Sequence, residues 1–283
     1  MNKIFKYSLM VFALASVMVS CTDEYEYDGP GKLVENDYGV EFSEQAVNRS
    51  IEFTSDEREY AIELTRANTQ GALTVPVIVN KAPSYLDVPS TVTFEDGSDV
   101  AELVITAKDN AEMFNTQSLS LSIPDEYAAN PYEQVYARFV NYDAKVVVTD
   151  YRKVATGIYT DKISGAGAFR WYIEYSDKME MYRFPSLYVD GYHFTFKWDG
   201  TNNADQLFYF CDSKGNKASS LETGMTYGTN GVISAVFLYS NFIGYDTDNA
   251  FYFPVYFKVN AGQLTNAGYV KFAVTEWLEK PWE

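Results

Sequence analysis

Apolar residues alternate with polar ones along much of this 283-residue chain, and this period of two constrains its fold more than any other feature. Leu119, Leu121 and Ile123, for example, alternate with serines. Successive side chains of a β-strand point to opposite faces, so the pattern predicts strands with one buried face. Between residues 31 and 150 no segment keeps a helical spacing of apolar residues long enough for a substantial helix. We therefore expect an all-β protein.

Residues 38–150 hold about seven short runs of this kind, separated by turn residues, which is the pattern of an immunoglobulin-like β-sandwich. Pro76 lies inside one run, and proline cannot donate a hydrogen bond to a strand ladder. We expect Pro76 at a sheet edge or at a bulge. Glu95–Ser98 places Asp and Gly between two runs and predicts a turn there.

The same segment resembles a Calx-beta domain. Thr91–Ile105 places a Phe-x-x-Gly turn between two strands, and Ser118–Ile123 follows as a third strand, as in the later half of that family. Some Calx-beta domains bind calcium through clustered acids, and the nearest candidates here are Asp96, Asp99 and Asp109. We expect these acids to cap backbone N–H groups of turns rather than to hold a metal ion.

Residues 155–283 form a second set of strands in which the alternating residues are mostly aromatic. Tyr, Phe and Trp make up 17% of the chain and are concentrated after residue 150. Phe194–Trp198 and Phe251–Val259 are clear examples of such runs. Together these runs predict a second β-sandwich or a jelly-roll-like barrel.

This second half resembles the C-terminal β-domains of uncharacterised surface lipoproteins of Bacteroidetes. The shared features are a Gly-x-Tyr opening, a Phe-x-Phe-x-Trp-Asp strand, a Tyr-Asp hairpin that leads to Phe-Tyr-Phe, and a late Val-x-Ala-Gly turn, found here at Gly157–Tyr159, Phe194–Asp199, Tyr245–Phe253 and Val259–Gly262. The resemblance implies a location and a general role rather than a specific activity.

Residues 1–20 have the pattern of an export signal. Lys3 and Lys6 supply a positive start, and Leu9–Val19 is an apolar run too short to span a bilayer. Ser20 and Cys21 follow, and this order resembles a bacterial lipoprotein signal, in which the cysteine after the cleavage site is lipidated. The resemblance implies that lipid on Cys21 anchors the chain in a membrane.

Residues 21–37 form an acidic linker. Asp23, Glu24 and Glu26 lie close together soon after the cysteine. Composition alone indicates a solvated spacer. Surface-exposed lipoproteins of Bacteroidetes carry a similar acidic stretch just after the lipidated cysteine. This resemblance implies that the three acids are a signal for export to the outer face of the outer membrane.

The formal charge of −17 argues against two classes of partner. Nucleic acids and anionic lipid surfaces attract patches of Lys and Arg, so we expect no nucleic-acid partner. The chain has two cysteines, and with Cys21 lipidated, Cys211 is left without a disulfide partner. We expect Cys211 to be a small core residue.

The sequence lacks a catalytic or metal-binding constellation. A Ser-His-Asp or Cys-His site would have to use His193, the sole histidine, which we expect to face solvent from a strand. One histidine and one spare cysteine do not make a zinc site. Among 39 acids, some pair can always be chosen to fit a glycosidase. The presence of acidic residues therefore does not distinguish a glycosidase from a protein without catalytic activity. We predict no enzyme, no metal site and no cofactor.

Surface aromatic rings are the remaining candidates for function, because apolar sugar faces stack on Trp and Tyr. Most rings in such strands lie in a core, but one small sandwich does not comfortably bury all of them. The candidate ligand-binding residues are Trp171, Tyr172, Tyr182, Tyr188, Tyr252 and Tyr256.

Two hypotheses follow for these rings. The first is a non-catalytic, surface-anchored protein that captures a polysaccharide through its aromatic second half. The alternative is a structural or adhesive protein that binds a surface protein through a sheet edge or through the same rings.

Overall fold

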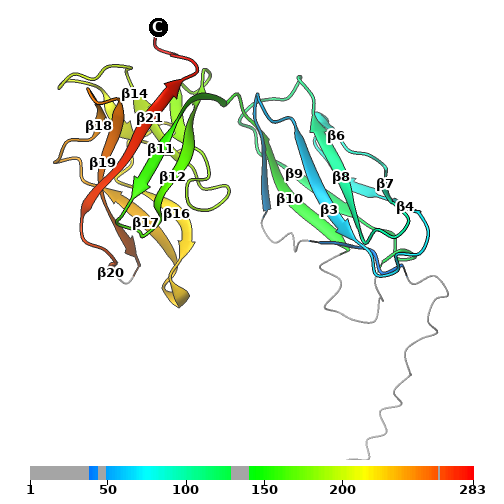
Figure 1. Ribbon diagram of the computed structural model, residues 1–283. Coiled ribbons are helices and arrows are strands. Elements are labelled where there is room, and N and C mark those ends of the chain that lie inside the picture. The colour runs from blue at the N-terminus through cyan, green and yellow to red at the C-terminus, as the bar shows by residue number, and fades with distance from the viewer. Residues whose placement is uncertain (1–37, 44–48, 129–139, 261) are drawn as a thin grey trace, which may run out of the picture.

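The computed structural model describes residues 38–43, 49–128, 140–260 and 262–283. They form an N-terminal sandwich (β1–β10) beside a C-terminal barrel (β11–β21), as Figure 1 shows. The predicted signal, Cys21 and the acidic linker lie outside the described residues. Strands dominate, which confirms the all-β prediction, and the short 3-10 helix η2 (Gly228–Asn230) adds little to them. In the described part of the chain, no helix is long and apolar enough to cross a membrane.

The N-terminal sandwich contains two four-stranded sheets. The first has the strand order β1 (Glu41–Phe42), β3 (Glu59–Thr65), β8 (Val100–Ala107), β6 (Leu86–Asp87). The second has the strand order β2 (Arg49–Phe53), β10 (Asn141–Val148), β9 (Gln117–Ser122), β5 (Ile78–Lys81). The two remaining strands, β4 (Leu73–Pro76) and β7 (Thr91–Phe94), form a separate pair. Pairing is antiparallel except between β2 and β10. Apolar side chains of both sheets, among them Phe42 and Phe53, form a single buried cluster.

Local patterns explain the details of the sandwich. β8 and β10 bury every second residue, as a period of two predicts. Pro76 ends β4 opposite Thr91 in the two-stranded sheet, so it lies at an edge as expected. The predicted turn joins β7 to β8, where the Ser98 N–H donates to the Glu95 carbonyl at 3.0 Å.

The C-terminal barrel is a single antiparallel sheet. Its order is β15 (Phe208–Phe210), β14 (Phe194–Trp198), β13 (Met181–Phe184), β12 (Gly167–Ser176), β11 (Arg152–Asp161), β21 (Gly268–Trp277), β19 (Ala250–Val259), β17 (Val232–Phe237), β16 (Ser220–Thr226), while β18 (Gly244–Asp246) and β20 (Gly262–Gln263) also pair with β19. Most neighbours in the sheet are also neighbours along the chain, as in an up-and-down barrel. Of the two forms expected for this half, the barrel-like one is present.

Aromatic side chains close the barrel. Phe210 of β15 and Phe237 of β17 come from strands near opposite ends of the sheet order, yet their ring centroids lie 3.9 Å apart. The Ala218 N–H donates to the Phe210 carbonyl at 2.8 Å along the same seam. The sheet is therefore curled until its two ends meet around an aromatic core.

Cys211 is a core residue, as expected. It is fully buried, and its Sγ lies 3.4 Å from Met181 Sδ. Burial raises the pKa of the Cys211 thiol to about 11, which disfavours the reactive thiolate.

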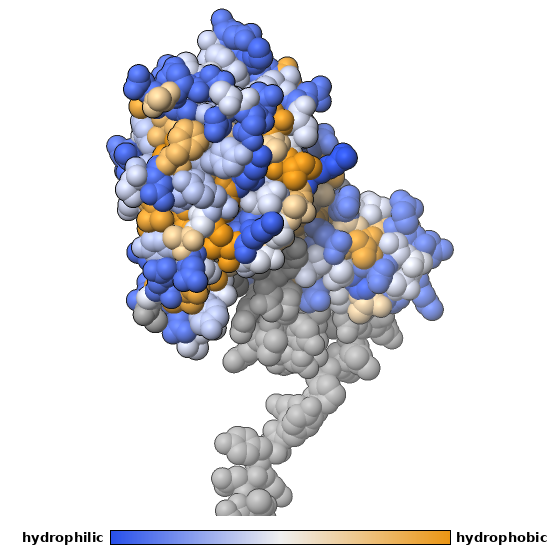
Figure 2. Space-filling model, turned by 60° about the vertical axis from the view of Figure 1, so that its left-hand side comes forward, coloured by the Kyte–Doolittle hydropathy of each residue, from blue (hydrophilic) through white to orange (hydrophobic). Residues whose placement is uncertain are grey.

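The outer surface of the barrel is mixed in polarity. Figure 2 shows several apolar patches separated by polar and charged side chains. Large exposed apolar residues come from different loops and strands, among them Leu207, Tyr227, Phe242 and Tyr269. Scattered apolar side chains of this kind are normal on protein surfaces.

Phe210→Ala tests whether the aromatic seam closes the barrel. Truncation of a buried phenylalanine should lower the free energy of unfolding by about 3–5 kcal/mol, through lost apolar burial and the cavity left behind. Phe242→Ala is the control, because Phe242 is 45% exposed. Urea denaturation should show a change within about 0.5 kcal/mol for the control. Equal effects of the two substitutions would contradict a closing role for Phe210.

Candidate functional site

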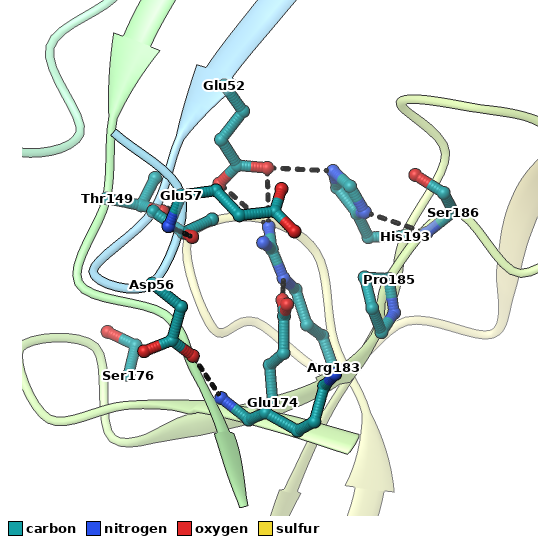
Figure 3. Close-up of polar contacts among 12 residues, drawn as sticks. Glu52, Asp56, Glu57, Thr149, Glu174, Ser176, Arg183, Pro185, Ser186 and His193 are labelled. Carbon is teal, nitrogen blue, oxygen red and sulfur yellow. Dashed lines mark hydrogen bonds and ion pairs between the residues drawn. The ribbon is translucent and has the colours of Figure 1, made fainter. Parts of the chain in front are cut away.

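The candidate site lies where the sandwich meets the barrel. β10 ends at Val148 and β11 begins at Arg152, so the connection between the two halves is very short. The Ser55 N–H donates to the Tyr151 carbonyl at 3.1 Å, which ties the segment after β2 to this connection. The end of β2 thereby approaches the outer face of the barrel (Figure 3).

Arg183 is the centre of the contact between the halves. In the antiparallel register of β12 and β13 it lies opposite Glu174, and its Nε donates to Glu174 Oε2 at 2.6 Å. Its Nη1 donates to both carboxylate oxygens of Glu52 at 2.8 Å. Its guanidinium carbon lies 3.8 Å from the centroid of the Tyr151 ring. Figure 3 shows Glu52 reaching toward Arg183 from the sandwich.

His193 is a second barrel partner of Glu52. The Ser186 N–H donates to His193 Nδ1 at 3.0 Å, so Nδ1 is the acceptor and the proton lies on Nε2. Nε2 lies 3.2 Å from Glu52 Oε2. The prediction that His193 faces solvent from a strand is wrong, because β14 begins at the next residue and Glu52 of the sandwich engages the ring.

The partners of Glu52 hold it in its charged form. Burial by itself raises the pKa of Glu52. The hydrogen bond from His193, the charge of Arg183 and the Thr149 hydroxyl, which donates at 2.8 Å, together outweigh burial and lower this pKa to about 2. Burial raises the pKa of Glu174, and the Arg183 guanidinium opposes that effect. We refer to Glu52, Glu174, Arg183 and His193 as the ion network.

A cleft of about 860 Å³ lies beside the ion network. Residues of both halves line this cleft, among them Glu57, Tyr60 and Phe114 of the sandwich and Trp171, Tyr172 and Asp190 of the barrel. The cleft therefore combines aromatic faces with charged and hydroxyl groups, as sites for polar organic ligands do.

Trp171 and Tyr172 form an aromatic pair in the wall of the cleft. Their rings stack with centroids 5.4 Å apart and planes 29° apart. Trp171 Nε1 donates to the Pro185 carbonyl at 2.9 Å, which orients the indole. Both side chains are half-buried, so part of each stays accessible. Two of the six predicted aromatic residues are thus brought together at one cleft.

A smaller groove of about 400 Å³ adjoins the same aromatic pair. Besides Trp171 and Tyr172, its lining includes Lys153, Ile158 and Arg170. Lys153 Nζ lies 4.2 Å from the centroid of the Tyr172 ring. The cleft and the groove together form the candidate binding site.

Tyr182 and Tyr188 lie elsewhere. Tyr182 is 2% exposed and stacks on Phe196 in the barrel core, with ring centroids 5.3 Å apart, so its prediction as a ligand contact is wrong. The Tyr188 hydroxyl donates to Asp161 at 2.6 Å, and its ring packs against Phe194. Both rings face inward, where large side chains fill the interior of the curled sheet.

Tyr252 and Tyr256 lie on β19 and line neither the cleft nor the groove. The Tyr252 hydroxyl donates to Asp248 at 2.6 Å, and Lys271 Nζ lies 5.1 Å from the centroid of its ring. Two strands, β11 and β21, separate β19 from β12 in the sheet order. The six predicted residues therefore do not form one platform.

Sequence reasoning missed the ion network. Glu52 is one of 39 acids and alternates normally between Ile51 and Phe53. Arg183 did carry a signal, because it lies between Tyr182 and Phe184, and an arginine in an apolar run is rarely buried unless it is paired.

One of the three candidate acids of the sandwich, Asp96, caps a backbone N–H group. Asp96 Oδ1 accepts a hydrogen bond from the Gly71 N–H at 2.8 Å, which is the kind of role expected for it. The bond that Asp99 accepts from the Arg66 N–H at 2.9 Å is to its main-chain carbonyl, so it does not test the role predicted for the carboxylate. Within the described ranges, no three or more His, Cys, Asp or Glu side chains are grouped so that they could hold a metal ion.

Comparison with known proteins yields distant structural likenesses. No family model and no curated protein matches the sequence. A protein of unknown function from Bacteroides ovatus is 10% identical, with a TM-score of 0.36 over 84% of this chain and 95% of its own. An auxiliary nutrient binding protein from Bacteroides thetaiotaomicron is 12% identical, with a TM-score of 0.30 over 82% and 91%. CBD12 from CALX1.2 is 8% identical, with a TM-score of 0.29 over 78% and 81%.

These likenesses do not assign the chain to a family, because all three TM-scores lie below 0.5. We therefore base the functional proposal on the cleft and the groove.

Glu52→Gln tests the ion network. It removes the charge that Arg183 and His193 share, and we expect a loss of about 1–3 kcal/mol in stability near pH 7. The folded pKa of about 2 lies below the ordinary value of 4.5. The contribution of Glu52 is therefore complete above about pH 4.5 and is lost as the pH falls toward 2. Calorimetry should show that the two proteins converge on acidification.

Glu59→Gln is the matched control, because Glu59 is an exposed acid on β3. It should leave the unfolding temperature nearly unchanged at each pH. If both substitutions had the same effect, the overall loss of negative charge would explain it, and a role for the ion network would be excluded.

Proposed function

We propose that this chain is a non-catalytic, surface-anchored binding protein that captures a glycan at the cleft between its sandwich and its barrel. The observation that carries the proposal is the Trp171–Tyr172 pair, whose partly accessible rings share the cleft with carboxylate, hydroxyl and imidazole groups. Apolar sugar faces stack on such rings, while sugar hydroxyls bond to the neighbouring polar groups. The cleft volume also lies within the range of about 300–1,000 Å³ found for small-molecule sites.

The carboxylates of the ion network support binding rather than hydrolysis. A glycosidase needs one carboxyl group as proton donor and a second as base or nucleophile, with both flanking the scissile bond. Glu52 and Glu174 both face Arg183 instead, at 2.8 and 2.6 Å. The lowered pKa of Glu52 keeps its carboxylate charged and makes it a poor proton donor, so the two groups do not form an acid and base pair around an open site. We therefore expect the bound glycan to be released intact.

The proposed location depends on residues outside the described structure. The resemblance of residues 1–21 to a lipoprotein signal supports lipid on Cys21. The acidic residues Asp23, Glu24 and Glu26 support export to the outer face of the outer membrane. In this arrangement the sandwich follows the anchor in the chain and acts as a spacer, and the barrel supplies most of the binding surface.

A protein partner is the second candidate, and strand β5 favours it. β5 is an edge strand with exposed side chains, and Ile78 and Val79 are 44% and 42% exposed. Such an edge offers main-chain hydrogen bonds to a strand of another protein.

A glycan array with residues 22–283, which include every described residue, tests the first candidate. We expect binding to at least one polysaccharide. Trp171→Ala and Tyr172→Ala should each weaken it about tenfold, because a lost stacking contact and its buried area are together worth roughly 1.4 kcal/mol or more. Tyr269→Ala is the control, since Tyr269 is 50% exposed and lines neither the cleft nor the groove.

Two outcomes of the array would contradict the proposal. Cleavage of the bound polysaccharide would show an enzyme. Failure to bind any glycan, together with capture of a surface protein that Ile78→Lys abolishes, would favour the second candidate.

Replacing Asp23, Glu24 and Glu26 by Ala tests the export signal. Protease added to intact cells should cut less of the variant than of the original protein, while the total amount of lipidated protein stays the same. The control replaces Glu35 and Asp37, two acids of the same linker that lie outside the acidic run. Undiminished cleavage of the first variant would exclude the export role.

A further inference from the structure

We infer that the glycan carries an anionic group, a carboxylate or a sulfate ester, and that the groove beside the Trp171–Tyr172 pair receives this group. The inference rests on the proposed function, because it concerns the charge of the glycan that the proposed function places on this aromatic pair.

The groove is a cationic spot on an acidic protein. The chain has a formal charge of −17, yet the charged side chains that line the groove are Lys153 and Arg170, and no carboxylate of a described residue lines it. The adjoining cleft has the opposite character, since four acids line it against two cationic side chains: Glu52, Glu57, Glu174 and Asp190 against Arg183 and Lys214. The aromatic pair therefore stands between an acidic surface and a cationic one.

The two cations of the groove are available to a ligand. Other cations nearby have structural partners: Arg152 pairs with Asp177 and Glu279, and Arg183 pairs with two acids of the ion network. Lys153 and Arg170 are both exposed, and within the described ranges neither side chain forms an ion pair with a carboxylate. The nearby Asp56 carboxylate accepts the main-chain N–H of Lys153 at 3.0 Å and not its ammonium group. A ligand that brings its own negative charge would supply the partner that the protein does not.

Strand geometry places these cations around the aromatic pair. Arg170 and Tyr172 are two residues apart on β12 and face Ile158 and Thr156 of β11, so they share one side of the sheet. The register of β11 shifts between Lys153 and Ala155, and the Lys153 ammonium lies over the Tyr172 ring. A sugar stacked on the pair can therefore present an acidic substituent to either cation.

The chemistry of the two cations suits carboxylate and sulfate oxygens. A guanidinium offers a planar fork of donors that matches two oxygens of one anion, and an ammonium adds a compact charge. Neutral sugar hydroxyls gain much less from such groups. The acids of the cleft repel an anionic substituent, so it has one favourable place, which is the groove.

A glycan array with matched acidic and neutral forms tests the inference. Polygalacturonate is compared with its methyl ester, and chondroitin sulfate with desulfated chondroitin, so that carboxylate and sulfate are separated. We expect at least one acidic form to bind about tenfold more tightly than its neutral counterpart, as one charge-assisted hydrogen bond allows. Rising salt should reduce this ratio.

Lys153→Gln and Arg170→Gln should each weaken binding of that acidic form by about tenfold and bring the ratio of acidic to neutral binding toward one. Lys162→Gln is the control, because Lys162 is an exposed cation of the barrel that lines neither the groove nor the cleft. Unchanged unfolding temperatures would show that all three variants fold. Equal binding of acidic and neutral forms, or binding of neutral glycans alone, would overturn the inference and leave the proposed function standing. Absence of any glycan binding would overturn both.

Discussion

The pairing of Arg183 with Glu52 and Glu174 is the interaction on which the arrangement of the two halves depends. Arg183 is 3% exposed, and a buried charge without partners costs several kcal/mol. Glu174 of the barrel supplies one partner, but the second must come from the sandwich. A buried ion pair adds little stability compared with apolar packing, so its effect here is on geometry. The sandwich has to present Glu52 at this point of the barrel, and the cleft forms beside that contact.

The second determinant is the way in which the barrel uses its aromatic residues. Most of its rings fill the interior, where Phe210 and Phe237 hold the two ends of the sheet together. Trp171 and Tyr172 differ because β12 departs from strict alternation at this point. Both are half-buried, while Ile173 and Glu174 after them are both buried. Two neighbouring residues of one strand therefore stack at a rim that remains open to solvent.

Because of these two determinants, the candidate site is acidic on one side of the aromatic pair and cationic on the other. The contact at Arg183 brings the acids of the sandwich to one flank of the aromatic pair. The regular pairing of β12 with β11 brings Arg170 to the other flank, and Lys153 reaches the same flank from the point where the register of β11 shifts. Stacking on aromatic rings has little preference for charge, so the flanks rather than the rings determine which substituents a bound sugar can carry.

What the sequence determined by itself is local. Periodic alternation was sufficient for the all-β class, the edge position of Pro76 and the turn at Glu95–Ser98, because each depends on residues close together in the chain. Burial of Cys211 followed from its residue type. The sequence also pointed to Trp171 and Tyr172, but together with four tyrosines that lie elsewhere. Alternation shows that a strand has two faces and does not show which face a curled sheet encloses.

Only the tertiary structure decided which groups meet. Glu52 and Arg183 are 131 residues apart in the chain, and no local pattern links them. The environment of His193 was misjudged for the same reason, since its partner belongs to the other half. Contacts of this kind arise from the packing of one folded half on another, which depends on shape and buried charge over long distances rather than on the period of a strand.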